Sequence, residues 1–198
     1  MWDERYSTQD YVFGTEPSGF LVRHSGLLEP GLKALAVADG EGRNSVFLAE
    51  KGLNVTAMDS SPVGLEKARR LAAEREVEVD FRMADLKSWR WTPEAYDVVA
   101  AIFIQFASPD FREEIFDGIE RTLKPGGLLL LHGYTPRQLA YDTGGPSAVE
   151  NLYEPDMLAE RFGSWEILRL EEYTAELAEG AGHSGTSALV DLIARKPG

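Results

Sequence analysis

The sequence lacks cysteine entirely and contains only three histidines in 198 residues. Without cysteine the chain cannot form disulfide bonds, a catalytic thiolate or a cysteine-ligated metal site. His24, His132 and His183 are scattered and have no metal-ligand spacing, so the sequence predicts no metal site. Long apolar runs are lacking as well. The longest one, around residues 128–131, is far too short to cross a membrane.

Positive charge is scarce, because 20 lysines and arginines stand against 33 aspartates and glutamates, for a net charge of -13. This surplus of negative charge repels phosphate backbones and anionic lipid surfaces. We therefore expect no nucleic-acid partner and no membrane attachment. The first residues, Met1–Arg5, lack the basic and then apolar pattern of a secretory signal, so a cytoplasmic protein is expected. The oligomeric state stays unknown from the sequence.

The chain does have enough apolar content for a core. Hydrophobic residues make up 43% of it, as is typical of folded globular proteins, and the length fits a single domain over residues 1–198. Residues 1–16 are aromatic and polar without a clear period. Two interpretations stay open for them: an N-terminal arm that packs its aromatic rings on the domain, or a flap over a bound cofactor.

Short apolar segments alternate with helical patterns along the chain. Strands are expected over 32–38, 53–58, 77–83, 96–103, 128–134, 165–177 and 186–196. Helices are expected from Pro17 to Pro30, over 43–51, from Ser61-Pro62 to about Arg75, over 110–123 and over 154–162, with a long polar loop at 135–153. This alternation predicts an α/β fold with a mostly parallel sheet. The segment 179–185 is too short for a crossover, so the last two strands must include an antiparallel one.

A strand, a glycine turn, a helix and a second strand follow one another within residues 34–59. The turn is 39–42 (Asp-Gly-Glu-Gly), the helix begins near Arg43, and Asp59 ends the second strand. Glycine lets backbone approach a ligand closely, and the start of a helix offers unpaired N–H groups. Asp59 can accept both hydroxyls of a ribose. Because ligands bind at the carboxyl ends of parallel strands, this unit predicts a nucleotide-like cofactor.

Two cofactors fit this unit to different degrees. A nicotinamide dinucleotide requires Gly-x-Gly-x-x-Gly, and Ser45 occupies the third glycine position. S-adenosylmethionine has no pyrophosphate, and its adenine suits a second acid, Asp85, beside the N–H of Leu86. S-adenosylmethionine therefore explains more of the sequence. The candidate cofactor-binding residues, which lie at strand ends or in the arm, are Tyr11, Asp39, Gly40, Gly42, Arg43, Asp59, Ser60, Ala84, Asp85, Leu86, Phe103 and Gln105.

Taken together, these segments resemble the class I S-adenosylmethionine-dependent methyltransferases over about residues 18–196. Within that class the chain is most similar to the bacterial tellurite-resistance and thiopurine methyltransferase group. The resemblance rests on residues 11–21, 39–61, 84–86, 96–103, 123–131, 143–146 and 179–185. It implies a Rossmann-like sheet of seven strands in the order 3-2-1-4-5-7-6, with strand 7 antiparallel and helices on both faces. It also implies methyl transfer to a small-molecule acceptor, for which a thiol or a chalcogen compound is one option.

The chain departs from the common first motif of that class, acid-x-Gly-x-Gly-x-Gly. Ala36 and Ala38 occupy the acid and first glycine positions, so Asp39 is the candidate contact for the ammonium of the cofactor. After the fourth strand the sequence reads Ile-Gln-Phe at 104–106 rather than Asn-Pro-Pro-Tyr. This difference argues against methylation of a nucleobase or an amide nitrogen.

Methyl transfer from a sulfonium needs alignment and exclusion of water more than it needs a base. A hydroxyl or ammonium acceptor does require one, and His183 on the 179–185 segment is the predicted catalytic base, with Glu179 predicted to orient it or to bind substrate. The long loop offers pocket candidates, Arg137, Tyr134, Tyr141 and Tyr153, and the glycines of 143–146 suggest a lid.

Two other functions stay open. A relative that binds S-adenosylmethionine without catalysis agrees with the altered first motif. An NAD-linked oxidoreductase agrees with the glycine turn and Asp59 but is opposed by Ser45 and Asp85.

Overall fold

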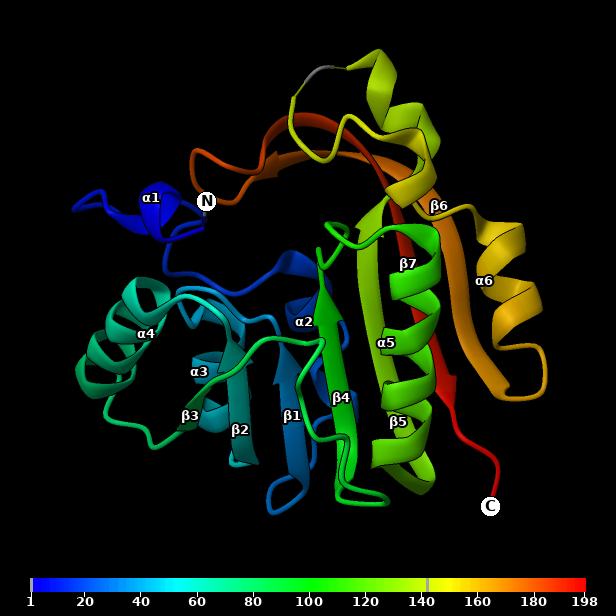
Figure 1. Ribbon diagram of the computed structural model, residues 1–198, viewed down its shortest axis with the longest axis horizontal. Helices are drawn as coiled ribbons and strands as arrows, with labels where there is room; N and C mark the ends of the chain where they lie inside the picture. Colours follow the sequence, from blue (N-terminus) through cyan, green and yellow to red (C-terminus); the bar gives the residue numbers. More distant parts are fainter. Residues whose placement is uncertain (1, 142) are drawn as a thin grey trace. The chain divides into compact units, whose positions relative to one another are not determined.

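The computed structural model describes residues 2–141 and 143–198 (Figure 1). Its strands form one seven-stranded sheet in the order β3-β2-β1-β4-β5-β7-β6. The strands are β1 (Lys33–Val37), β2 (Asn54–Asp59), β3 (Asp80–Met83), β4 (Tyr96–Ile102), β5 (Leu123–Tyr134), β6 (Glu166–Ala178) and β7 (Ser184–Arg195). The order is the one that the resemblance to class I methyltransferases implies, so the Rossmann-like fold class is confirmed.

Strand directions agree with the prediction too. The pairs β1–β2, β2–β3 and β4–β5 are parallel, whereas β7 runs antiparallel to both β5 and β6. The β6–β7 hairpin is long, with Glu166 opposite Arg195 at one end and Ala178 opposite Ser184 at the other. The hairpin therefore confirms the argument from connection length.

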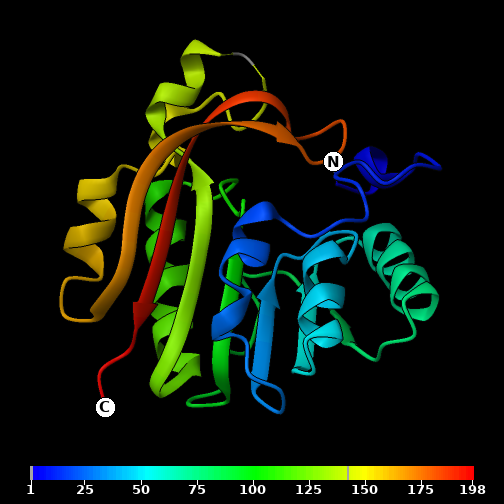
Figure 2. The ribbon, with the colours of Figure 1, turned by 180° about the vertical axis from the view of Figure 1, so that it is seen from behind.

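Helices surround the sheet (Figure 2). They are α1 (Trp2–Tyr6), α2 (Gly19–Arg23), α3 (Arg43–Glu50), α4 (Pro62–Glu74), α5 (Pro109–Thr122) and α6 (Pro155–Arg161), with short 3-10 turns η1 (Ser25–Leu27), η2 (Pro136–Ala140) and η3 (Val149–Asn151). Within the described residues, 2–141 and 143–198, no helix is long and apolar enough to span a bilayer.

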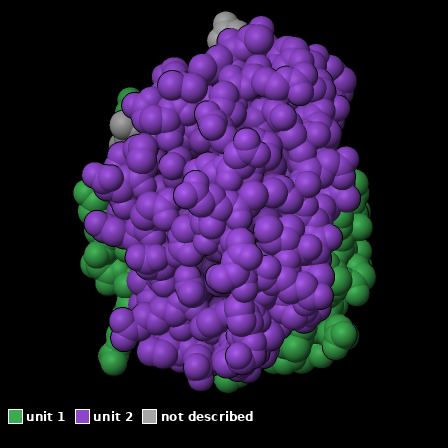
Figure 3. All heavy atoms as spheres, turned by 90° about the vertical axis from the view of Figure 1, so that its right-hand side faces the viewer, with its two compact units in different colours: residues 1–90, 179–182 green, residues 91–178, 183–198 purple. Residues whose placement is uncertain are grey.

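The chain divides into two compact units, which Figure 3 distinguishes by colour. Unit 1 comprises residues 1–90 and 179–182, and unit 2 comprises residues 91–178 and 183–198. Unit 1 supplies β1, β2 and β3, and unit 2 supplies the other four strands. The expectation of a single domain over 1–198 stays a prediction.

In unit 1 the local sequence determines where the helices start. Ser61 caps α4 by accepting a hydrogen bond from the backbone N–H of Gly64 at 3.0 Å, and Pro62 occupies the first helical position. The amphipathic face of α4 buries Leu65 and Leu71, and each such side chain contributes roughly 1.5–3 kcal/mol. The predicted start and end of this helix are both confirmed.

In unit 2 the continuous apolar run of β4 is buried, as expected for a strand covered on both faces. Helix α5 lies against β5 (Figures 1 and 2), and Phe116 and Ile119 on its buried side are fully covered. Lys196 donates to the carbonyl oxygens of Glu120 and Leu123 at 2.7 and 2.8 Å, so it caps the carboxyl end of α5.

Several predicted boundaries are wrong for identifiable reasons. Helix α2 starts at Gly19 rather than Pro17, because Ser18 accepts from the N–H of Phe20 and acts as the cap. The third strand covers only 80–83, because parallel pairing with β2 begins at Asp80. Strand β5 starts at Leu123 rather than 128, because Leu123 already pairs with Tyr96. The loop at 135–153 contains η2 and η3.

Candidate functional site

Asp59, at the carboxyl end of β2, fastens the glycine turn. Its carboxylate oxygens accept hydrogen bonds from the backbone N–H groups of Gly40 and Ser61, both at 2.8 Å. Burial raises the pKa of this carboxyl group, while the N–H donors of Ser61, Gly40 and Ser60 lower it. A carboxylate offers about four acceptor sites. Asp59 therefore keeps capacity to accept the hydroxyls of a ribose.

Asp39 contacts the start of α3. Its carboxylate accepts from the N–H of Ser45 at 3.2 Å and from the Ser45 hydroxyl, and Ser45 also donates to the carbonyl of Gly42 at 3.1 Å. Burial raises the pKa of Asp39 to about 7, and the bonds from Ser45 counteract this only in part. The predicted contact of Asp39 with the cofactor ammonium stays a prediction. In the structure the Asp39 side chain bonds to Ser45, and the spacing of the glycine motif does not predict this bond.

The turn itself requires glycine at two positions. Gly40 and Gly42 have φ angles of 61° and 91°, in the left-handed region. A Cβ atom on Gly42 would lie 2.6 Å from the Cβ of Ala68 on α4, so any side chain there would collide with the helix. A Cβ atom on Gly40 would lie 2.6 Å from the hydroxyl of Tyr6. The predicted role of these glycines in close backbone approach therefore has a geometric basis.

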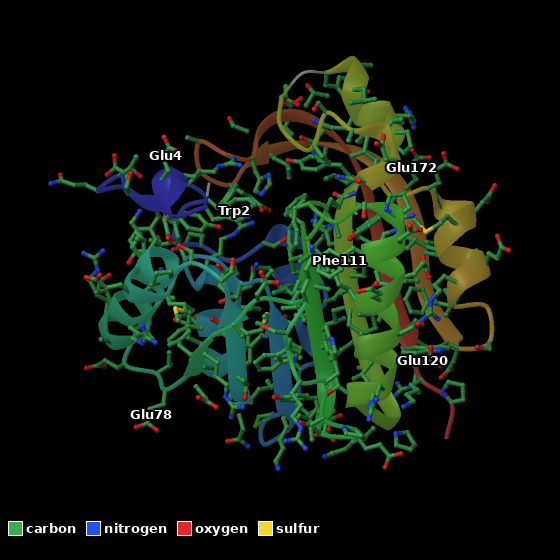
Figure 4. All side chains as sticks on the ribbon, viewed as in Figure 1. Trp2, Glu4, Glu78, Phe111, Glu120 and Glu172 are labelled. Carbon is green, nitrogen blue, oxygen red and sulfur yellow. The ribbon has the colours of Figure 1, made fainter. Side chains whose placement is uncertain are left out.

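Tyr6 brings the N-terminal arm onto the turn. Helix α1 packs on α4, the ring of Tyr6 is buried against Gly40, and Trp2, labelled in Figure 4, stacks on it with ring centroids 5.6 Å apart. Asp3 accepts a hydrogen bond from the hydroxyl of Ser61. Burial, together with the negative charge of Asp59, raises the pKa of Tyr6 far above its usual range. The arm thus lies against the turn, in the position that either interpretation of residues 1–16 requires.

A buried ion pair ties the same arm to α4. The Glu41 carboxylate lies 2.7 Å from the ammonium of Lys67, and both side chains are almost fully buried. Glu41 also accepts from the N–H of Val12 at 2.8 Å, and Lys67 donates to the carbonyl of Asp10 at 2.8 Å. The hydroxyl of Tyr11, a predicted cofactor contact, donates to the carbonyl of Lys67 at 3.0 Å. Tyr11 is therefore part of this anchor.

Glu179 and Arg43, predicted to serve catalysis and cofactor binding, are partners of one another. Their ion pair measures 2.8 Å, and Glu179 also accepts from the N–H of Gly19 at 2.9 Å. Gly182 N–H donates to the carbonyl of Val12 at 2.9 Å, and Gly180 packs on Gly14. These contacts attach the 179–182 segment to the arm and to the start of α3. Glu179 thus has a structural role that its place in a turn does not reveal.

Asp85, the predicted adenine contact, is exposed and caps its own turn. Its carboxylate accepts from the N–H of Lys87 at 2.8 Å, and its carbonyl accepts from the hydroxyl of Ser88 at 3.1 Å. The N–H of Ala84 donates to the carbonyl of Asp59 at 2.9 Å, and the side chain of Leu86 is buried. This bond places the 84–86 segment next to the end of β2, which is the proximity that the sequence predicts.

In unit 2, His183 belongs to an aromatic cluster. Its Nδ1 atom lies 2.6 Å from the hydroxyl of Tyr134, and its ring stacks on that of Phe103 with centroids 4.1 Å apart and planes at 23°. Phe103 has a φ angle of 55°, unusual for a residue with a side chain, and its N–H donates to the carbonyl of His132 at 2.8 Å. Such strained residues concentrate at functional sites.

Gln105 holds the backbone of this cluster in place, and its predicted contact with the cofactor stays a prediction. Its side-chain oxygen accepts from the N–H of Tyr134 at 2.6 Å, and its nitrogen donates to the Tyr134 carbonyl at 2.8 Å and to the Asn151 carbonyl at 3.3 Å. Both ends of the buried amide are therefore engaged by backbone. Gln105 bonds to Tyr134 at the end of β5 and to Asn151 in a distant loop. Because both partners are far away in sequence, the local sequence does not predict this contact.

A second network surrounds Asp191, which is fully buried on β7. Its carboxylate lies 2.8 Å from Nδ1 of His132, accepts from the hydroxyl of Tyr173 at 2.9 Å, and lies 3.3 Å from Nε of Arg169. His132 contacts the ring of Phe103 edge-on, with centroids 4.7 Å apart. His132 is therefore a buried and hydrogen-bonded residue.

The predicted pocket residues of the long loop lie in environments that differ from one another. Arg137 is exposed and lies 3.8 Å from Glu172, which is labelled in Figure 4, whereas Tyr153 is buried against Phe116 of α5. Gly144 and Gly145 have φ angles of 135° and 85°, so the expected unusual backbone angles are confirmed, whereas the lid itself stays a prediction. Tyr141 is half-buried. Among residues 2–141 and 143–198 no cluster of three acidic or histidine side chains could hold a metal ion.

Comparison with known proteins agrees with this fold and geometry. Residues 34–127 match the family described as "Methyltransferase domain", a range that includes the glycine turn, Asp59 and Phe103. A structure from work on the conversion of a disulfide bond into a thioacetal group during echinomycin biosynthesis superimposes with a TM-score of 0.78. It is 18% identical and covers 98% of this chain and 88% of its own. These matches define a methyltransferase-like fold.

Particular relatives extend the comparison. TehB from Haemophilus influenzae has a TM-score of 0.72 at 20% identity, covering 98% of this chain and 65% of its own. A ubiquinone biosynthesis O-methyltransferase from Xylella fastidiosa is 32% identical over 102 residues, 51% of this chain and 41% of that protein. The chain spans 41% to 61% of the length of the curated relatives that it matches. Together the domain match and these relatives support S-adenosylmethionine as the cofactor.

Proposed function

We propose that the protein transfers the methyl group of S-adenosylmethionine to a small-molecule acceptor. The observation that carries the proposal is the bond between the Asp59 carboxylate and the Gly40 N–H. It joins the acid at the end of β2 to the glycine turn, the two elements that a ribose and an amino-acid tail require. The domain match over residues 34–127 and the relatives named as methyltransferases support the same activity.

The residues of unit 1 suit this cofactor. Asp59 keeps acceptor capacity for a ribose hydroxyl, and Gly40 and Gly42 expose backbone for the amino-acid tail. The N–H of Leu86, in the segment that Ala84 holds next to Asp59, is the predicted donor to adenine. In this proposal Tyr6 and the arm cover the turn and exclude water from it. When bound, S-adenosylmethionine supplies an electrophilic methyl group on a sulfonium.

The acceptor class follows from the chemistry of the reaction. Displacement at a sulfonium methyl suits a soft nucleophile such as a thiolate. The structural relative from echinomycin biosynthesis is described by a reaction at sulfur. A thiol or another chalcogen compound is therefore the proposed acceptor. His183 stays the predicted base for an acceptor that must lose a proton.

Calorimetry with the full chain tests the proposal. S-adenosylhomocysteine should bind wild type in the micromolar range, and Asp59→Ala should weaken binding at least tenfold, because two hydrogen bonds to a buried charge are lost. Asp80→Asn is the matched control, because Asp80 is an exposed acid on β3 that pairs with Arg82 at 2.6 Å. Equal affinity of wild type and Asp59→Ala, or preferential binding of NAD, would contradict the proposal.

A second candidate function is cofactor binding without catalysis. It is favoured by one observation, the replacement of the usual acid and first glycine of the motif by Ala36 and Ala38. Incubation of wild type with labelled S-adenosylmethionine and a panel of thiols, selenols and phenols separates the two. Label transfer to any acceptor supports the enzyme, whereas tight binding with no transfer across the panel supports the binding protein.

A further inference from the structure

Three consecutive backbone N–H groups at the glycine turn of unit 1 donate to two consecutive residues of β2. Ala38 donates to the Sδ atom of Met58 at 3.3 Å. Asp39 donates to the Met58 carbonyl oxygen at 3.1 Å, and Gly40 donates to the Asp59 carboxylate at 2.8 Å. Only the sulfur among these three acceptors requires methionine at position 58, because a carbonyl oxygen is present whatever residue stands there.

Ala38 has a backbone conformation that alanine rarely adopts. Its φ angle is 48°, in the left-handed region, where the Cβ atom crowds the following carbonyl oxygen. Until Val37 the chain is an extended strand, and Val37 lies opposite Met58 in the parallel pair of β1 and β2. The chain turns out of β1 at Ala38, and the Met58 sulfur accepts the N–H of this turned residue.

We propose that Met58 is a positioning residue for the cofactor, because its sulfur keeps Ala38 in the left-handed conformation and thereby fixes the glycine turn; this role in binding rests on the proposed function. Ala38 stands where the common first motif has a glycine, which adopts a positive φ without cost, and Ala36 stands where that motif has an acid. The Met58 side chain is 1% exposed, so close packing holds the sulfur in place.

The sulfur contributes something that packing alone does not. Leucine has nearly the volume of methionine, so Met58→Leu leaves the interior beside β2 filled, but it deprives the Ala38 N–H of its acceptor. The left-handed alanine and the unpaired donor then both favour a different backbone. We expect Ala38 to return toward an extended conformation and the turn to become mobile. More binding energy is then lost in ordering the turn when a cofactor binds.

Hydrogen exchange measured by NMR tests the bond in the free protein, without any cofactor. In Met58→Leu we expect the Ala38 amide to exchange at least tenfold faster than in wild type, because it has lost its acceptor. The amide of Leu35, within β1, reports on the fold and should stay protected in both proteins. Met157→Leu is the matched control. It makes the same substitution at a half-buried position of α6 in unit 2, and it should leave the Ala38 amide unchanged.

Calorimetry with S-adenosylhomocysteine tests the consequence for binding. We expect Met58→Leu to weaken the affinity at least fivefold and Met157→Leu to leave it within twofold of wild type. Adding Ala38→Gly to Met58→Leu should restore the affinity to within twofold of wild type, because glycine adopts a positive φ without an anchor. Ala36→Gly in the same background is the control. Ala36 lies within β1 opposite Ala57, so glycine there relieves no strain and should restore nothing.

Biosynthetic replacement of the sulfur provides a test that does not depend on how Met58→Leu folds. Norleucine exchanges the sulfur of each of the four methionines for a methylene group, whereas selenomethionine keeps an acceptor of the same kind. We expect the norleucine protein to bind S-adenosylhomocysteine at least fivefold more weakly than wild type. The selenomethionine protein should stay within twofold. Equal affinities of these two proteins would overturn the role of the sulfur.

The remaining outcomes are distinguishable. An Ala38 amide that exchanges equally fast in wild type and Met58→Leu overturns the positioning role, whatever happens to binding. A loss of affinity that Ala38→Gly does not repair overturns it as well, because the loss then comes from packing and not from the conformation of Ala38. Failure of wild type to bind S-adenosylhomocysteine overturns the proposed function, and exchange of the Ala38 amide then decides by itself whether Met58 holds the turn.

Discussion

The backbone N–H of Gly40 donates to the carboxylate of Asp59, and this bond connects the glycine turn to the end of β2. The other oxygen of the same carboxylate accepts from Ser61, the N-cap of α4. One buried acid thus fastens two helix-starting segments before any ligand is present. A turn held in this way is preorganised, so less binding energy is lost in ordering it when a cofactor binds.

The titration of Asp39 should make stability depend on pH. Its folded pKa of about 7 lies above its unfolded value of 3.8, so between these values the folded state binds more protons than the unfolded state. The contribution of Asp39 to stability is therefore full below pH 4 and is lost as the pH rises toward 7. We expect the loss to be on the order of 2 kcal/mol, allowing for screening of this half-buried group.

Urea unfolding of wild type and Asp39→Asn at several pH values between 4 and 7.5 measures this effect. The free energy of unfolding of wild type, minus that of the variant, should fall with rising pH, because the amide does not titrate. Acids that do not interact with Asp39 contribute equally to both proteins and cancel, whereas the neighbouring Asp59 is coupled to it. A difference that stays constant would show that folding leaves the pKa of Asp39 unchanged, and one that grows with pH would show that its charged form is stabilised.

Replacement of Gly42 by alanine should destabilise the fold strongly. The φ angle of 91° disfavours any side chain, and the added Cβ would lie 2.8 Å from the Cα of Ala68, a backbone atom that cannot move alone. Backbone strain and overpacking together cost about 2–4 kcal/mol. Gly26→Ala is the control, because a Cβ there meets nothing within 4 Å. Chemical denaturation of both variants checks the prediction, and equal stability would contradict the collision with α4.

The buried pair Glu41–Lys67 should behave differently from an exposed pair. Lys67→Met leaves the Glu41 charge buried without its partner, which costs about 3–5 kcal/mol. It should also loosen residues 10–13, because Asp10 loses its donor from Lys67, and proteolysis should detect this. Disruption of the exposed Asp80–Arg82 pair by Asp80→Asn should cost below about 1 kcal/mol. Similar costs for the two variants would mean that Glu41 is rehydrated.

The sequence predicts features that depend on short stretches of chain. The start of α4 follows from Ser61-Pro62, and the antiparallel β7 follows from the length of 179–185, since both are local constraints. The Glu41–Lys67 pair and the brace from Gln105 to Tyr134 join residues far apart in sequence, and no local pattern encodes them. The start of β5 is missed for the same reason. The segment 123–127 contains proline and glycine, and it is extended because Leu123 pairs with the distant Tyr96.

Site residues show this limit most clearly. The position of Asp59, at a strand end next to a glycine turn, could be predicted from the local sequence, whereas its contact with a ribose stays a prediction. Glu179 could not, because its partners Arg43 and Gly19 come from the opposite end of the chain. The contact of Tyr6 with the glycine turn could not be predicted either, because residues 1–16 show no periodicity. Residues that bind a ligand directly leave a local pattern, whereas those that hold the site together do so through tertiary contacts.

The carboxylate of Asp191 should be the most sensitive buried charge of unit 2. His132, Tyr173 and Arg169 all direct donors at it, so Asp191→Ala removes an acceptor that three polar groups share. We expect a loss of about 3–5 kcal/mol in the free energy of unfolding, whereas Tyr173→Phe, which removes one neutral donor, should cost about 1 kcal/mol. The double variant separates the contributions. If Tyr173→Phe costs less in the Asp191→Ala background than in wild type, the hydroxyl acts through Asp191; full additivity would contradict the network and assign the cost to packing alone.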